Sequence, residues 1–169
     1  MPLGGLLTSV AAAEPAPGGG SISAIAVALA AGLTAMAARF SADHLSDATE
    51  LAERADTLRT RVAPLARTDA EAYGRVLAAR RESGRSVEEA LSEAADVPLA
   101  VAEVGEEVAR IAERLAEHGN PNLKGDATTA VLLVGAATRA AATLAGINLS
   151  AAGIEDERLE RARELSGPI

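Results

Sequence analysis

Hydrophobic residues recur at helical spacing along most of the chain, most clearly between residues 21 and 40. Large apolar side chains step there by three or four positions, and alanines form a second stripe (Ile22, Ile25, Leu29, Leu33, Met36 and Phe40; Ala24, Ala28, Ala31, Ala35 and Ala38). No charged residue occurs between Ser21 and Ala38. This pattern predicts a helix with one bulky face and one alanine face, on which a neighbouring helix can pack closely.

Other segments repeat the same period. We expect a short helix over residues 3–13, a long amphipathic helix over 47–80 that Pro64 kinks, a helix along the stripe 97–115, and a small-residue helix over 127–146. The charged stretch 154–165 predicts a loosely docked terminal helix. No stretch alternates as a strand does. The chain is therefore predicted to be one all-α domain, residues 1–169, a bundle of about six to eight helices with long kinked amphipathic helices around two Ala-rich buried helices.

Composition fits this class and narrows the function. Of 169 residues, 49% are hydrophobic but only 1% are aromatic, so the core must consist of alanine, leucine and valine. The net charge of -8 disfavours nucleic acids and anionic membranes as partners, and the absence of cysteine excludes thiolate chemistry. A mean hydropathy of +0.14 indicates more apolar surface than one protomer can hide, and an interface between identical chains is the natural place for it.

The amino-terminal segment lacks the basic start of a secretory signal, so we expect a cytoplasmic protein. The uncharged run 15–38 is long enough to cross a membrane. Its high content of alanine, glycine and serine makes it only weakly hydrophobic, which favours a buried helix of a soluble protein.

Residues 15–21 read Pro-Ala-Pro-Gly-Gly-Gly-Ser and immediately precede the first long helix. Gly18, Gly19 and Gly20 let the backbone come close to another group, and the Ser21 hydroxyl can cap free amides. The amino end of a helix attracts anions, so a carboxylate-bearing ligand could bind there. A tight turn before a buried helix explains the same residues.

A second candidate is Asp69, which falls where the apolar stripe of the 47–80 helix calls for a hydrophobic residue. A carboxylate on a buried face is costly unless it is paired, and this makes it a candidate for function. Alternatively, Pro64 resets the phase, Thr68 and Glu71 form a capping box, and Asp69 faces solvent.

The third candidate is the turn-rich loop 120–126, in which Asp126 is the expected amino cap of the 127–146 helix. The small residues of that helix match the alanine face of the 21–40 helix. We expect the two helices to cross at close range with their starts together. Lys124 is the single lysine among sixteen basic residues, and lysine shifts its pKa more readily than arginine.

The chain resembles the cyclodeaminase/cyclohydrolase family, which includes methenyltetrahydrofolate cyclohydrolases and the carboxy-terminal domain of formimidoyltransferase-cyclodeaminase. The matching motifs are residues 15–21, 69–73 (Asp-Ala-Glu-Ala-Tyr), 97–99 (Val-Pro-Leu), 119–122 with 125–127 (Gly-Asn-Pro-Asn and Gly-Asp-Ala), and 147–149 (Ile-Asn-Leu). The chain departs from the family pattern at 41–44 and at Gly125. The resemblance implies an all-helical homodimer, a tetrahydrofolate derivative as substrate and no further cofactor. No metal is expected, because His44 and His118 have no ligand-like spacing with carboxylates.

The same resemblance implies the site residues and the reaction. It implies hydrolysis of 5,10-methenyltetrahydrofolate to 10-formyltetrahydrofolate, with Asp126 as the leading carboxylate, Asp69 as the second, and Lys124 as proton donor or contact to the folate glutamate. The substrate-binding set is Gly18, Gly19, Gly20, Ser21, Asn120, Asn122 and Asn148. Two alternatives remain open at this point. The first is a formimidoyltetrahydrofolate cyclodeaminase that releases ammonia, and the second is a non-catalytic helical folate-binding or interaction protein.

Overall fold

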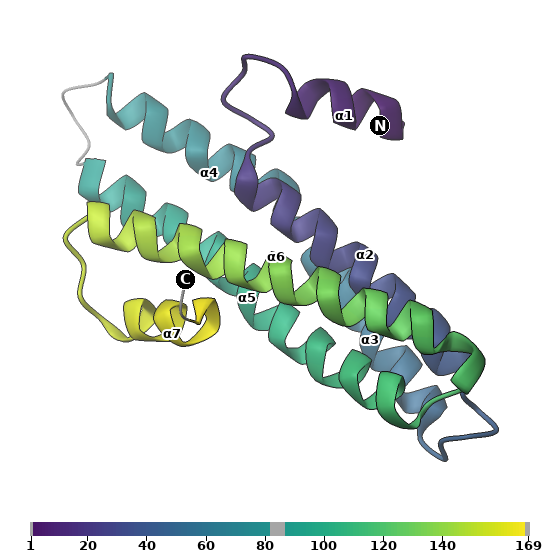
Figure 1. Cartoon of the computed structure of the whole chain (residues 1–169). Coiled ribbons are helices and arrows are strands. Elements are labelled where there is room, and N and C mark those ends of the chain that lie inside the picture. Colours follow the sequence, from purple (N-terminus) through teal and green to yellow (C-terminus); the bar gives the residue numbers. More distant parts are fainter. Residues whose placement is uncertain (1, 82–86, 168–169) are drawn as a thin grey trace.

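The computed structural model describes residues 2–81 and 87–167, and every regular element within these ranges is a helix (Figure 1). In chain order these are α1 (Leu3–Val10), α2 (Gly19–Arg39), α3 (Ala48–Val62), α4 (Leu65–Ala79), α5 (Val87–His118), the short 3-10 helix η1 (Pro121–Leu123), α6 (Lys124–Ala151) and α7 (Glu157–Ser166). The predicted all-α bundle is confirmed.

Helix α5 is the central element of the bundle. It contacts α2, α3, α4, α6 and α7, and its 32 residues extend about 48 Å. Val101, Val104 and Val108 are buried in the main core together with alanines and valines of α2 and α6. The helix continues through Pro98 and extends beyond the predicted stripe 97–115 at both ends. One long helix therefore contacts five of the other α-helices, α2, α3, α4, α6 and α7.

Helices α2 and α6 lie side by side and run in opposite directions (Figure 1). At one end, Gly19 of α2 lies beside Leu144 of α6. At the other end, Asn120 Nδ2 donates a 2.8 Å hydrogen bond to the carbonyl of Phe40. The alanine face of α2 is buried, whereas its bulky face points outward, with Leu29 60% exposed. The apolar surface expected from the composition is thus found on one side of α2.

Pro64 divides the predicted 47–80 helix into α3 and α4. A proline has no amide to donate, so the hydrogen-bond ladder is interrupted there although the backbone keeps helical angles. The capping box considered for Thr68 and Glu71 does not form. The Thr68 hydroxyl donates to the Pro64 carbonyl at 3.3 Å, and Glu71 pairs with Arg67 at 3.4 Å.

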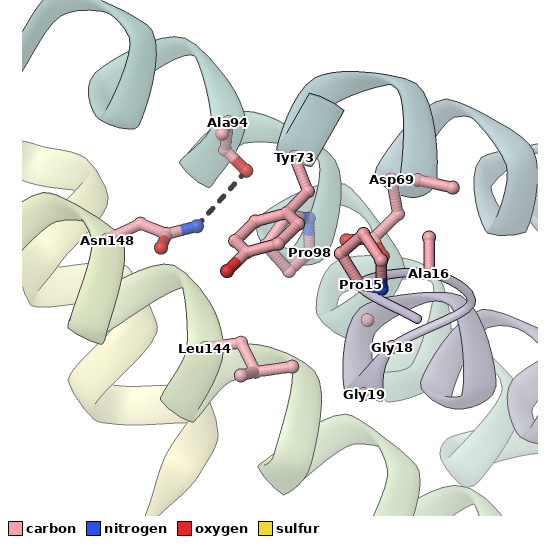
Figure 2. A pocket seen from close by; sticks show the side chains of 12 residues that line it. Pro15, Ala16, Gly18, Gly19, Asp69, Tyr73, Ala94, Pro98, Leu144 and Asn148 are labelled. Carbon is pink, nitrogen blue, oxygen red and sulfur yellow. Dashed lines mark hydrogen bonds between the residues drawn. The ribbon is translucent and has the colours of Figure 1, made fainter. Parts of the chain in front are cut away.

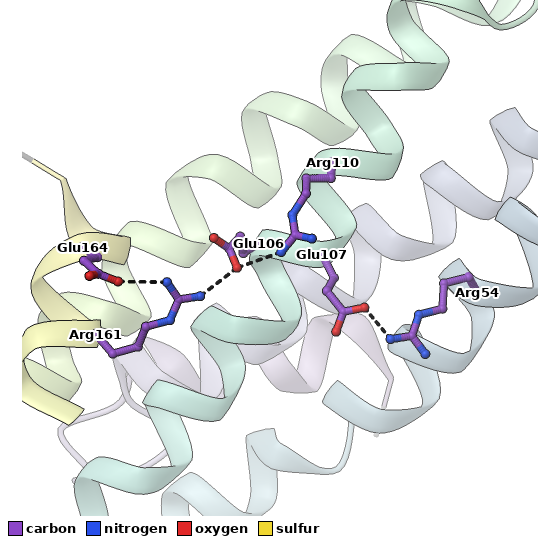
Figure 3. A network of polar contacts seen from close by, with 6 residues as sticks. All are labelled: Arg54, Glu106, Glu107, Arg110, Arg161 and Glu164. Atoms are coloured by element: carbon purple, nitrogen blue, oxygen red, sulfur yellow. Dashed lines mark hydrogen bonds and ion pairs between the residues drawn. The ribbon is translucent and has the colours of Figure 1, made fainter. Parts of the chain in front are cut away.

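The terminal helix α7 is firmly docked, and the expectation of a loose helix is wrong. Leu159 and Ala162 are buried against the bundle. Arg158 pairs with Asp96 of α5 at 2.8 Å. Arg161 pairs with Glu106 of α5 at 2.7 Å (Figure 3). Two arginines of α7 therefore bind carboxylates on α5, which the sequence of α7 alone does not reveal.

Two helical segments, Gly19–Arg39 and Pro121–Ala151, are long and apolar enough to cross a membrane by length and composition alone. In the structure 56% of the apolar stretch in the first segment is buried inside the bundle, and 39% of that in the second. Both segments therefore have one side packed against the rest of the chain and one side left at the surface.

Candidate functional site

A cavity of about 310 Å³ lies at the end of the bundle where α2 starts (Figure 2). Its walls come from the loop before α2, from α4, from α5 and from the last third of α6. The lining residues are Pro15, Ala16, Gly18, Gly19, Gly20, Asp69, Ala70, Tyr73, Ala94, Pro98, Leu144 and Asn148. Segments far apart in the chain thus meet at one place.

The glycine-rich start of α2 forms one wall. Gly18 has an extended backbone and precedes the helix, and no side chain of the described residues caps the free amides of the first turn. The sequence suggests that Ser21 could cap the helix, but it does not do so in the structure. It lies inside the first turn, and its hydroxyl donates a 3.0 Å hydrogen bond to Oδ2 of Asp69 on α4.

Asp69 contacts the backbone of α2 directly. A Cβ on Gly20 would overlap the Asp69 carboxylate, with Oδ2 only 2.8 Å away and Oδ1 nearer still. Asp69 is half-buried, neither enclosed in the core nor free in solvent. It is the one charged side chain among the residues that line the cavity. The cavity therefore offers a single carboxylate in a largely uncharged surrounding.

The remaining walls combine an aromatic ring, an amide and apolar groups. Tyr73, one turn after Asp69 on α4, points into the cavity (Figure 2). Asn148 of α6 donates from Nδ2 to the carbonyl of Ala94 at 3.4 Å, which leaves its Oδ1 free to accept. Leu144 and Pro98 complete the apolar part. These walls suit a flat, partly polar ring.

The structure brings together six of the predicted site residues, namely Gly18, Gly19, Gly20, Ser21, Asp69 and Asn148. Tyr73, Leu144 and Pro98 were not predicted. The spacing of Tyr73 from Asp69 is the signal that could have found it, because residues i and i+4 share a helix face.

Four predicted residues, Asn120, Asn122, Lys124 and Asp126, lie at the opposite end of α2. The expectation that the starts of the two small-residue helices come together is wrong. Because α2 and α6 are antiparallel, the start of α2 meets the end of α6 instead. The 21 residues of α2 separate the two ends by about 30 Å.

The hydrogen bonds of Asn120 hold the chain at that far end. Its backbone amide donates to Ser41 Oγ at 2.9 Å, and its Oδ1 accepts from the amide of Asn122 at 2.9 Å. Asp126 lies in the first turn of α6 rather than at its cap, which Leu123 occupies. Lys124 is exposed and forms no ion pair within the part of the chain that the structure describes.

The all-α bundle and the carboxylate-bearing cavity at a glycine-rich helix start agree with what the resemblance to the cyclodeaminase/cyclohydrolase family implies. The chain matches the family model described as formiminotransferase-cyclodeaminase over residues 2–165, and it belongs to this family. The resemblance predicted from the motifs is therefore confirmed.

Two relatives indicate the range of activities in the family. The chain is 33% identical to the methenyltetrahydrofolate cyclohydrolase of Methylorubrum extorquens over an alignment of 179 positions, which covers 95% of this chain and 85% of that protein. It is also similar to the crystal structure of formiminotetrahydrofolate cyclodeaminase from Thermotoga maritima, with a TM-score of 0.88 and 31% identity. That match covers 98% of this chain and 88% of the other.

Proposed function

We propose that this protein hydrolyses 5,10-methenyltetrahydrofolate to 10-formyltetrahydrofolate. The observation that carries the proposal is the Asp69 carboxylate, the single charge on the cavity wall. The methenyl bridge carries a positive charge that is delocalised over N5 and N10 of the folate. A carboxylate in a partly enclosed site attracts this charge more strongly than the same carboxylate would in bulk water. The named activity of the Methylorubrum relative agrees with this substrate.

The reaction needs one group that accepts and returns a proton. Water attacks the carbon of the methenyl bridge, and Asp69 takes a proton from that water as the new carbon–oxygen bond forms. The resulting intermediate has a tetrahedral carbon between N5 and N10. Asp69 then returns the proton to N5 as the carbon–N5 bond breaks. The remaining hydroxyl proton leaves to solvent, and the formyl group stays on N10.

The other walls can hold the substrate. The Tyr73 ring gives the bicyclic ring of the folate an aromatic surface, and Asn148 Oδ1 can accept a hydrogen bond from a ring N–H. The free amides at the start of α2 favour a carbonyl oxygen or a carboxylate. A cavity of about 310 Å³ holds the ring system, and the rest of the substrate extends outside it.

The test follows the near-ultraviolet absorbance of methenyltetrahydrofolate. The wild-type protein should bleach it faster than buffer, and Asp69→Asn should lose at least about 100-fold of kcat. Glu71→Gln is the matched control, because Glu71 lies two residues away on the same helix, exposed and paired with Arg67. Equal bleaching with and without protein would contradict the proposal.

The second candidate is cyclodeamination of formiminotetrahydrofolate. It is favoured by the similarity to the Thermotoga structure, which bears that name. The same carboxylate would assist ring closure and the departure of ammonia. Incubation with formiminotetrahydrofolate would then release ammonia and increase the absorbance that the first reaction removes, so the two assays separate the candidates.

We also propose that two copies of the chain associate through the outward face of α2 and α6. Leu29 and Leu132 are 60% and 70% exposed near the middle of these helices, and Phe40 is 62% exposed. The protomer exposes 9062 Å², whereas a compact monomer of 17.0 kDa should expose about 7,700 Å². The difference is larger than the roughly 800 Å² that each partner buries in a standard interface. A second copy covers this surface best, because large apolar side chains are exposed on both helices, which carry only four charged residues between them (Arg39, Lys124, Asp126 and Arg139).

A further inference from the structure

The hydroxyl of Ser21 is already committed to Asp69. Ser21 is 1% exposed, and its hydroxyl donates its single proton to Asp69 Oδ2, with 3.0 Å between the two oxygens. A hydroxyl has one proton to donate, so Ser21 cannot give it to a substrate at the same time. Its burial also keeps it from contact with a ligand in the cavity. Its role is therefore toward the aspartate.

Ser21 differs in this from other hydroxyl residues of the helices. Ser23 and Thr34 of α2, and Ser41 in the turn that follows it, each donate to the carbonyl four residues earlier, at 2.8–2.9 Å. Back-bonding of this kind is the usual local partner for a helical hydroxyl. Ser21 lies in the first turn of α2, and the residue four positions before it precedes the helix. Its hydroxyl is consequently free to reach across to α4.

Gly20 fixes the other side of the same carboxylate. Without a side chain, it lets the Asp69 carboxylate lie against the α2 backbone, where any Cβ would overlap it. The carboxylate is thus confined by a hydrogen bond on Oδ2 and by backbone contact beside Oδ1. A carboxylate that is held in one orientation spends more of its time in the geometry that the reaction requires, so the reaction is faster.

We infer that Ser21 is a positioning residue, which together with Gly20 fixes the Asp69 carboxylate at the cavity wall and does not itself bind substrate. The catalytic part of this inference rests on the proposed hydrolysis. The pairing of Ser21 with Asp69 does not, because it can be measured without any substrate.

The kinetic test uses Ser21→Ala, Asp69→Asn and the double variant, each checked for helicity by circular dichroism. Ser21→Ala should lower kcat about 10- to 100-fold and leave KM unchanged, because a misplaced reacting group costs rate rather than affinity. In the Asp69→Asn background, Ser21→Ala should lower kcat less than 2-fold. This is at most about one-fifth of the effect that it has in the wild-type protein. Ser23→Ala, a buried serine whose hydroxyl stays within α2, is the control and should keep the wild-type kcat.

The second measurement is independent of activity. Melting temperatures of the wild type, Ser21→Ala, Asp69→Ala and their double variant form a double-mutant cycle, in which alanine at position 69, unlike asparagine, has no oxygen to accept from Ser21. The two single losses should not add in the double variant if the side chains are coupled. Additive losses would overturn the pairing even if the enzyme is active. Coupled losses with an inactive wild-type protein would uphold the pairing and reject the proposed hydrolysis. A rise in KM without a change in kcat in Ser21→Ala would instead show that Ser21 binds substrate, and would overturn the inference.

Discussion

Gly105 of α5 lies so close to Thr138 of α6 that a Cβ at position 105 would overlap Thr138 Oγ1. Thr138 is buried, and its Oγ1 has no hydrogen-bond partner among the described residues. The Thr138 side chain thus occupies the space that a side chain at position 105 would need. The packing of α5 against α6 therefore requires a glycine at this position.

Gly105→Ala should destabilise the protein by about 1–3 kcal/mol, because the added methyl group must displace α6 or force Thr138 from its rotamer. Urea unfolding followed by circular dichroism measures the effect. Gly74→Ala is the control, since a Cβ there meets nothing within 4 Å and helix propensity predicts a gain of about 0.5–1 kcal/mol. Thr138→Ala should rescue Gly105→Ala, and an unchanged loss in that double variant would exclude the overlap as the cause.

Leu29→Glu should convert the proposed dimer into monomers, because a charge at the centre of an apolar interface cannot be solvated there. Light scattering coupled to size-exclusion chromatography measures the mass. Ala63→Glu, exposed at the break between α3 and α4, is the control and should keep the wild-type mass. A wild-type protein that is already monomeric at micromolar concentration would reject the interface.

Asp126→Asn should retain the kcat of the wild-type protein, because its carboxylate lies about 30 Å from the cavity of its own protomer. The test compares the steady-state kcat for hydrolysis of methenyltetrahydrofolate in the wild-type protein, Asp126→Asn and Asp69→Asn. A loss in both variants would mean that a second copy carries Asp126 to the cavity. Mixing the two inactive variants would then restore part of the activity, because one site of each mixed dimer would be intact.

Acid should remove the contribution of Glu106 to the docking of α7. Burial raises the pKa of this carboxyl, but hydrogen bonds from Arg161 and Arg110 and the charges of both outweigh it, so the pKa lies below its ordinary value of 4.5. The native state thus favours the ionised form. Its contribution is fully present above pH 4.5 and is lost as the pH falls through the lower native value.

The measurement is the melting temperature of wild type and Glu106→Gln between pH 7 and pH 3. The difference should be largest at neutral pH and correspond to less than about 1 kcal/mol, because the pair is partly exposed and screened by solvent. It should decrease as the pH falls below 4.5. A difference that stays the same across this range would show that Glu106 acts through packing and not through its charge.

Several features of the fold could be predicted from the sequence because they depend on local periodicity. The α2 stripe, the break at Pro64 and the all-helical class follow from the spacing of apolar residues and from the chemistry of proline. Asp69 is a candidate site residue from the sequence because it interrupts an apolar stripe. Its actual environment, half-buried against the backbone of Gly20, lies between the two alternatives that the pattern offered.

The direction in which helices pack could not be predicted in this way. Matching small-residue faces indicate that α2 and α6 are neighbours, but the match is the same for parallel and antiparallel packing. The separation of Asp126 from Gly20 follows from that direction alone. The docking of α7 could not be predicted for a related reason. Arg161 pairs with Glu106 of α5, which lies 55 residues earlier in the chain.

The alanines of α2 and α6 also determine how the cavity keeps its shape. An alanine side chain has no χ1 rotamers, so a contact made of alanines has no alternative arrangement into which it can relax. The distance between α2 and α6 is therefore fixed by backbone geometry rather than by adjustable side chains. Because Gly19 at the start of α2 lies beside Leu144 in the last third of α6, the same fixed spacing limits how far these two walls of the cavity can move apart.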